Sequence, residues 1–273
     1  MTKKLLPTMI GAALIGGMTA ASADVTVFGH LDAAITNFDT GAAGPGSDDT
    51  NFQCTTCSIG FKGSEDLGNG LKAIFKLDFQ FDTFERNRVV TTNTTTSTAF
   101  GSGAITDRDQ WVGLAGGFGK VRAGTISTVY KSHGAMIDPL YRTALQGRDH
   151  GLQSNFHTGA NEEGRGRATN TIRWDSADFN GVKLGAHYTL DSNELDGEDD
   201  NPYGIGASYS NGGILAFVDY ITTDGSVATG NDIEAWKVGG KYSMGNIAIM
   251  GQFEDAEANT QDRQTWHIGG SYT

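Results

Sequence analysis

The sequence predicts an all-β fold, a transmembrane antiparallel β-barrel, and three observations support this. Apolar and polar residues alternate with a period of two along many short segments, which is the pattern of strands. The polar positions carry charges of both signs, whereas the apolar positions carry aromatic residues along their length. Short connections also alternate with long polar ones. An apolar outer face, a polar inner face and unequal rims are typical of a membrane barrel.

The clearest element is a hairpin within residues 57–82. From Leu71 to Phe81 every odd position is apolar, and the even positions include Lys72, Lys76, Asp78, Gln80 and Asp82, which we expect to line water. Upstream, Ile59, Phe61 and Gly63 alternate with polar residues. The two runs are joined by Asp66-Leu67-Gly68-Asn69-Gly70, whose Asn-Gly pair favours a tight turn.

The same alternation recurs along the chain and predicts twelve strands. The first runs from Val25 to Ile35, and the hairpin supplies the second and third. In the fourth, Trp111, Gly113 and Ala115 are assigned to the apolar face, with Arg108, Gln110 and Val112 on the polar one. The remaining strands are expected within residues 120–130, 171–175, 182–190, 203–209, 214–220, 236–242, 247–253 and 266–272.

Connections within hairpins have two to five residues, and those between hairpins are long, as at 39–55, 85–106 and 131–165. This inequality places the N-terminus on the periplasmic side. Aromatic residues near strand ends fit the girdle at lipid headgroups, and the alternative is that they fill the core of a soluble sandwich. They are Trp111, Trp174, Tyr188, Tyr203, Tyr209, Tyr220, Trp236, Tyr242, Trp266 and Tyr272.

The first 23 residues have the features of a secretory signal peptide. Lys3 and Lys4 precede a short apolar run that ends in Ala21-Ser22-Ala23, which fits better than a retained membrane helix. We expect domain boundaries of 1–23 for the signal peptide and 24–273 for the barrel. Residues 24–273 carry 18 basic and 32 acidic side chains, a formal charge of −14, which disfavours nucleic acid as a partner.

Cys54 and Cys57 are the two cysteines of the chain, spaced as Cys-x-x-Cys. The spacing suits a redox pair or half a metal site, but no second cysteine pair exists, and we expect no metal and no cofactor. In an exported protein a small loop disulfide is the favoured interpretation.

Five blocks of this sequence resemble the general porins of Gram-negative bacteria, of the kind common in beta- and gammaproteobacteria. They are Asp24-Val-Thr-Val-Phe-Gly-His, Ile59-Gly-Phe-Lys-Gly-Ser-Glu-Asp-Leu-Gly-Asn-Gly-Leu-Lys-Ala, Trp111-Val-Gly-Leu, Phe118-Gly-Lys-Val-Arg-Ala-Gly, and Asn170-Thr-Ile-Arg-Trp-Asp-Ser with Asn180-Gly. The resemblance implies a sixteen-stranded barrel, a homotrimer, and a third long loop that folds into the lumen. Such porins end on an aromatic residue after about four more strands, so we expect a truncated chain rather than a native twelve-stranded barrel.

The resemblance implies a cell outer membrane location, contact with lipid and lipopolysaccharide, and passive diffusion of small hydrophilic solutes and ions. Its selectivity would come from wall cations opposed to carboxylates of the third loop. The candidate wall residues are Arg108, Arg122, His30, Arg165 and Arg167, and the candidate loop acids are Asp138 and Asp149. Ser58 occupies a position where the family often places a pore arginine. With the charge of −14, we expect mild cation preference.

Three alternatives remain at this point. The acidic run 191–200 could hold a divalent cation that bridges to lipopolysaccharide, or be an ordinary solvated loop. A substrate-specific channel would need aromatic residues along the lumen, and only Phe28 and Phe217 are placed away from the lipid face. An outer-membrane enzyme would need a nucleophile beside a base, and none of the six histidines accompanies such a motif, so we do not expect an enzyme.

Overall fold

The computed structural model describes residues 24–39, 48–81, 83–84, 90–92, 95–97, 105–143, 145–147, 166–190, 201–223, 233–258 and 261–273. The predicted signal peptide, Asp82, Asp149, Arg165 and the acidic run 191–200 lie outside the described residues. Within them, no helix is both long enough and apolar enough to cross a membrane.

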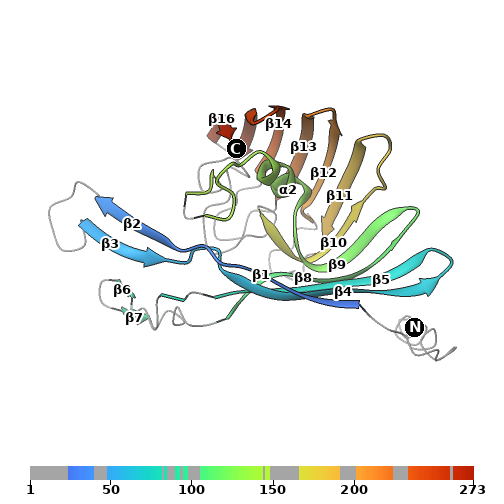
Figure 1. The fold of residues 1–273 in the computed structure, drawn as a ribbon, viewed down its shortest axis with the longest axis horizontal. Helices are drawn as coiled ribbons and strands as arrows, with labels where there is room; N and C mark the ends of the chain where they lie inside the picture. The colour runs from blue at the N-terminus through green and yellow to red at the C-terminus, as the bar shows by residue number, and fades with distance from the viewer. Residues whose placement is uncertain are drawn as a thin grey trace.

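Twelve strands form one continuous antiparallel sheet in which each strand pairs with its neighbours along the chain. This confirms the predicted twelve-stranded wall, and the sheet curves so that it has a concave and a convex face (Figure 1). Among the described residues its two edges are β1 and β16. The strands are β1 (Asp24–His30), β4 (Ser58–Gly68), β5 (Leu71–Gln80), β8 (Thr106–Gly116), β9 (Gly119–Ser127), β10 (Arg167–Asp175), β11 (Val182–Thr189), β12 (Tyr203–Asn211), β13 (Ile214–Thr223), β14 (Ile233–Met244), β15 (Ile247–Ala258) and β16 (Gln261–Tyr272).

The tight turns follow the predicted turn chemistry. Asn69 and Gly70 between β4 and β5 have φ of 52° and 77°, and Gly212 and Gly213 between β12 and β13 have 58° and 85°. Two consecutive positive φ angles match the twist of the flanking strands, and asparagine and glycine adopt them at low cost. These turns lie on one rim, and the long connections leave from the other (Figure 1).

Two small hairpins in the long connections were not predicted. The chain leaves the sheet after His30, so the expected strand to Ile35 is wrong; β2 (Ala34–Asp39) pairs instead with β3 (Asp48–Gln53). In the next long connection, β6 (Val90–Thr92) pairs with β7 (Thr95–Ser97). Polar residues dominate these segments, so they lack the apolar face that identifies a strand in the sequence.

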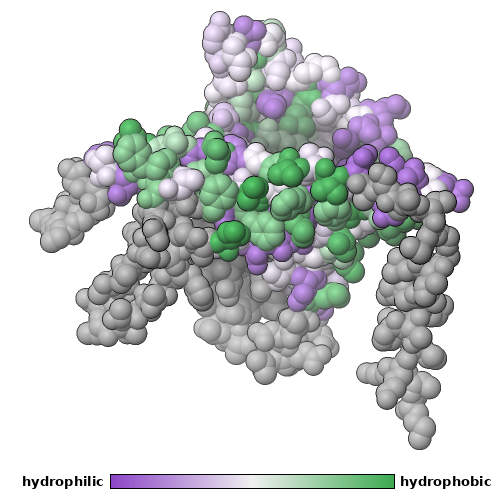
Figure 2. All heavy atoms as spheres, turned by 60° about the horizontal axis from the view of Figure 1, so that its bottom comes forward, coloured by the Kyte–Doolittle hydropathy of each residue, from purple (hydrophilic) through white to green (hydrophobic). Residues whose placement is uncertain are grey.

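The convex face of the sheet is apolar. Figure 2 shows hydrophobic side chains gathered over its N-terminal strands, and this face continues to β16, where Ile268 is 78% exposed. Most of the predicted girdle aromatics are exposed on it, among them Tyr203, Trp236 and Trp266. Lipid, not water, is the solvent that suits such a surface.

The predicted facing of β8 is wrong. Trp111 pairs with Lys76 of the polar face, and the guanidinium of Arg122 lies 5.1 Å from the centre of its ring. Val112, which is 64% exposed, belongs to the lipid face. The alternation is ambiguous here because Val112 and Leu114 are as apolar as the residues between them.

The third loop, residues 128–166 between β9 and β10, begins with a helix where the sequence predicted strand to Tyr130. Thr128 ends the strand and caps the helix α2 (Val129–Met136), since its hydroxyl accepts a hydrogen bond from Lys131 N at 3.1 Å. The helix lies on the concave side of the sheet, over β11, β12 and β13 (Figure 1). The third loop therefore folds inward, as the resemblance implied.

Two paired glycines make room for this helix. Gly185 of β11 and Gly206 of β12 are cross-strand partners, and both lie beneath the buried Val129. A Cβ on Gly206 would come within 2.7 Å of Val129 Cγ1 and 2.0 Å of Asp219 Oδ1. The wall must be flat here for the loop to rest on it.

Candidate pore lining and constriction

The concave face of β5, β8 and β10 carries a network of paired charges. Lys76 Nζ lies 3.2 Å from Asp78 Oδ2 and 3.4 Å from Asp109 Oδ2. Asp109 Oδ1 also accepts a hydrogen bond from Arg167 Nε at 2.9 Å and from the Ser127 backbone and hydroxyl groups. The structure thus brings together Lys76, Asp78 and Arg167, three of the residues that the sequence analysis selected.

Arg108 joins the same network. Its Nη1 donates to Gln80 Oε1 at 2.7 Å, and its Nε lies 3.6 Å from Asp78 Oδ2. The side chain is nearly buried, and the charges of Arg142 and Arg167 lie close enough to interact with it. The interaction means that three guanidinium groups gather on this part of the wall.

Sequence reasoning missed Asp109. Strict alternation would put Arg108 and Asp109 on opposite faces, but the pairing of β5 with β8 shifts between Leu77 and Phe79, and both side chains reach the inner network. The available signal was energetic, because a carboxylate facing lipid in mid-strand is costly. A β-bulge resolves that conflict.

A second set of charges lies on β9 and β10. Arg122 and Arg173 both bond to the carboxylate of Asp175, with Arg173 Nη2 at 2.6 Å from Asp175 Oδ1. Arg173 Nη1 also donates to the hydroxyl of Ser132 in α2 at 2.7 Å. Arg122 was predicted as a wall cation, whereas Arg173 was not, although it lies in the matched block that begins at Asn170.

The helix α2 is fixed to the wall by buried polar contacts. His133 Nδ1 lies 2.7 Å from Asp219 Oδ1, and Lys237 Nζ donates to the carbonyl of Tyr130. Burial, assisted by the nearby charge of Glu254, raises the pKa of Tyr130 well above its ordinary value, so the phenol stays neutral. At the exposed end of the helix Lys241 Nζ donates to Met136 O at 3.2 Å.

Apolar packing completes the contact between loop and wall. Ile137 of the third loop packs with Phe217 of β13 and Met250 of β15, all buried. The His133 ring stacks on Phe217 with 5.5 Å between ring centroids. Phe217 was expected to face away from lipid, and it serves as the seat of the loop.

Asp138, the candidate acid of the third loop, bonds to backbone N–H groups of the same loop. Asp138 Oδ1 accepts from Leu140 N and Oδ2 from Gly147 N, each at 2.9 Å, and the residue is only 8% exposed. The carboxylate therefore fixes the shape of the loop beyond α2. Its expected partner in the constriction, Asp149, lies outside the described residues.

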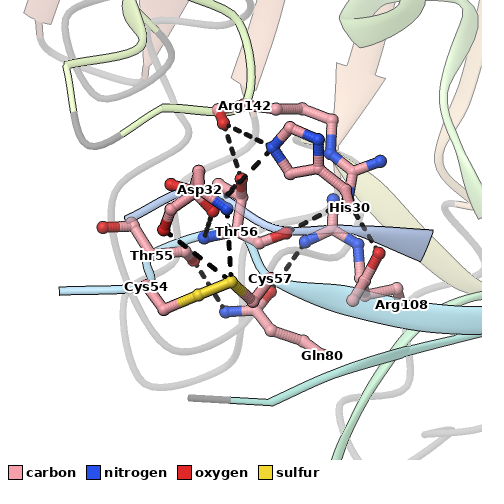
Figure 3. Close-up of a disulfide and its surroundings, with 10 residues drawn as sticks. His30, Asp32, Cys54, Thr55, Thr56, Cys57, Gln80, Arg108 and Arg142 are labelled. Atoms are coloured by element: carbon pink, nitrogen blue, oxygen red, sulfur yellow. Dashed lines mark hydrogen bonds and ion pairs between the residues drawn. A yellow bond between two sulfur atoms is a disulfide. The ribbon is translucent and has the colours of Figure 1, made fainter. Parts of the chain in front are cut away.

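The far end of the described loop meets β1 and β4 at a disulfide. Cys54 and Cys57 are bonded and buried, and His30 Nε2 lies 3.0 Å from Arg142 O (Figure 3). Asp32 Oδ1 accepts hydrogen bonds from the backbone and hydroxyl groups of Thr56 in the disulfide turn at 3.1 and 3.0 Å. The described part of the loop, residues 128–143 and 145–147, thus contacts the wall in two places, on β10 to β15 and on β1 and β4.

A curved antiparallel sheet with an apolar convex face, a charged concave face and an inward loop defines a transmembrane β-barrel pore protein. The chain belongs to the Gram-negative porin family, whose sequence profile matches residues 10–273. Members of this family reside in the outer membrane and are channels rather than enzymes.

Curated relatives include major outer membrane protein P.IB of Neisseria gonorrhoeae, 31% identical over 77% of this chain and 55% of its own length. The corresponding protein of Neisseria meningitidis serogroup A is 28% identical over 91% of this chain and 67% of its length. The chain spans about half the length of the first of these relatives.

Solved structures show the same fold. The anion-selective porin from Comamonas acidovorans has a TM-score of 0.69 at 22% identity, over 92% of this chain and 74% of its own. Salmonella typhi OmpF in complex with daunomycin has a TM-score of 0.66 at 14% identity, over 93% of this chain and 75% of its own. At these identities the likeness concerns the fold.

Proposed function

We propose that the protein is an outer-membrane porin that lets small hydrophilic solutes and ions diffuse passively through a water-filled pore, with mild cation preference. The observation that carries this proposal is the charged concave face, with the described part of the third loop held against it at two separate places. Such a loop narrows a lumen without closing it, and the charges around it act on ions that pass.

The proposed cation preference follows from where acidic and basic side chains balance one another and where they do not. On the described wall, Lys76, Arg108 and Arg167 are offset by Asp78 and Asp109, so this region holds no excess of acid. The chain from residue 24 nevertheless carries −14. The acidic excess lies elsewhere and attracts cations toward the pore over the range of a Debye length, about 8 to 10 Å at physiological salt.

Reversal potentials across a KCl gradient in a planar bilayer test the preference. We expect a cation-to-anion permeability ratio modestly above one that falls toward one as salt is raised, because screening weakens distant charges first. Clear anion selectivity at low salt would overturn it. The anion selectivity of the Comamonas acidovorans porin is no guide, since the likeness is one of fold.

General diffusion is favoured over a substrate-specific channel because other side chains cover the aromatic rings on the inner face. Lys62 and Lys76 lie over the ring of Phe28, Arg122 lies over Trp111, and Phe217 is buried beneath the third loop. Rings covered in this way do not offer a stacking path for a sugar. Liposome swelling with neutral sugars of graded mass should therefore follow size, and a sharp preference at equal mass would favour the specific channel.

We also propose that the protein acts as a homotrimer whose apolar outer face contacts lipid and lipopolysaccharide. The exposed apolar side chains along the convex face support this, because bare water would be an unfavourable neighbour for them. Chemical cross-linking in native outer membranes should give a trimer, and a monomer at saturating cross-linker would contradict it.

A further inference from the structure

Arg142 of the third loop is held in a conformation that its surroundings must impose. Its φ is 64°, in the left-handed region that residues with a Cβ seldom occupy. Its carbonyl oxygen lies 2.8 Å from Thr56 Oγ1 and 3.0 Å from His30 Nε2. Its guanidinium Nη2 donates to Thr56 O at 3.0 Å and to Ser58 Oγ at 2.7 Å. Both ends of the residue are therefore bound to the same short piece of wall (Figure 3).

The piece of wall that receives Arg142 is shaped by the disulfide. Thr56 lies between Cys54 and Cys57, is 2% exposed, and is bonded to Asp32 from the chain that leaves β1. Asp32 N in turn donates to Cys57 Sγ at 3.4 Å. The turn closed by the disulfide thus presents the Thr56 carbonyl and hydroxyl groups in the positions that Arg142 uses.

The contact brings a positive charge to a wall position that has none of its own. Ser58 faces the same inner surface as its cross-strand partner Gln80, to which Arg108 is bonded. The acceptors that bind the Arg142 guanidinium there are a carbonyl and a hydroxyl, both neutral, so they leave its charge in place. Arg142 is also close enough to Arg108 for their charges to interact.

We propose that Arg142 is a specificity-determining residue of the pore: the disulfide turn 54–57 docks it at Ser58, where it supplies from the loop a cation at a wall position that carries none. The inference rests on the proposed pore function and assigns the disulfide a role in selectivity. Its role is to hold the docking surface, not to carry out redox chemistry.

A charge relocation tests the first part. In planar bilayers, Arg142→Ala should raise the cation-to-anion permeability ratio about twofold, the effect of one charge several ångströms from the ion path at moderate salt. The double variant Ser58→Arg/Arg142→Ala puts the cation back on the wall and should return the ratio to the wild-type value. Arg263→Ala removes the same charge from an exposed position near the outer end of β16, on the concave face but outside the Arg142 dock, and should shift the ratio less than Arg142→Ala does.

Reduction of the folded channel tests the second part. A water-soluble phosphine, added during recording, is oxidised to its oxide while the disulfide gains two electrons and two protons from water to give two thiols. The wild-type ratio should rise in the same direction as in Arg142→Ala, and the phosphine should have no further effect on the Arg142→Ala channel.

The outcomes separate the proposals. If the wild-type chain carries no ion current, the proposed pore function fails. If it conducts and Arg142→Ala matches wild type, or Arg263→Ala shifts the ratio equally, Arg142 is not a specificity determinant. If thiol labelling shows that the phosphine has reduced Cys54–Cys57 and the wild-type ratio is unchanged, the disulfide does not hold the dock.

Discussion

Replacement of Asp219 by leucine should release α2 from the pore wall. Asp219 is 1% exposed and its Oδ1 lies 2.7 Å from His133 Nδ1, which is itself buried. Leucine has a similar size but accepts no hydrogen bond, so the imidazole is left without this partner. The same carboxylate also faces the buried ammonium group of Lys237.

The expected magnitude follows from the burial. An orphaned buried polar group costs about 1–3 kcal/mol, and about 2 kcal/mol corresponds to a change of roughly 30-fold in the ratio of displaced to docked loop. Single-channel recording measures that ratio as the fraction of time spent in a higher-conductance level, since a displaced loop widens the lumen.

A second variant supplies the comparison. Lys241→Met removes the hydrogen bond that Lys241 Nζ donates to Met136 O. This bond is 3.2 Å long and exposed to solvent. Water replaces such a bond, so the change should be about 0.5 kcal/mol, or roughly twofold. Asp219 does not hold α2 on the wall if the Asp219→Leu channel spends no more time at the higher conductance level than the Lys241→Met channel does, provided that both variants fold into heat-resistant channels.

Three further predictions concern the wall. Gly206→Leu should displace α2 at a cost of about 1–3 kcal/mol and raise conductance, because even its Cβ would overlap Val129. The control Ala207→Leu, on the lipid face, should leave conductance unchanged, and equal conductance in the two variants would mean that α2 does not need a glycine at position 206. Asp109→Asn leaves Lys76 and Arg167 without their shared carboxylate. The cation-to-anion permeability ratio obtained from reversal potentials should fall about twofold, and an unchanged ratio would mean that passing ions do not interact with this network. Gly70→Val forces a β-branched residue to a φ of 77° and should lower stability to urea in lipid vesicles by about 1–2 kcal/mol, while a neutral effect would contradict the positive-φ turn.

The wall could be predicted from the sequence because its face alternates residue by residue. Where one face is aromatic and the other charged, as in β5, the assignment holds for each residue that the structure describes. It fails in β8, where Val112 and Leu114 are as apolar as Trp111, and where a register shift turns Arg108 and Asp109 toward the same side. Sequence periodicity does not reveal a β-bulge, but the energetic cost of placing the Asp109 carboxylate in lipid could have indicated one.

The candidate constriction was less predictable, because its contacts join residues far apart in the chain. Nothing local indicates that Arg142 meets Ser58, 84 residues earlier, or that His133 meets Asp219. Asp138 was selected for its charge, but the loop uses that charge to bind its own backbone. Ser58 was noted only as a position without an expected wall cation, and the sequence did not indicate that Arg142 of the loop bonds to it.

The central claim, that the charged concave face lines a water-filled pore while the convex face meets lipid, is tested most directly with adjacent cysteines on β5. Lys76→Cys and Leu77→Cys place a thiol on opposite faces of one strand, and the native cysteines are already bonded to each other. We expect a charged, membrane-impermeant thiol reagent to change the current through the Lys76→Cys channel within seconds and to leave the Leu77→Cys channel unaffected. A current change in Leu77→Cys with none in Lys76→Cys would contradict it.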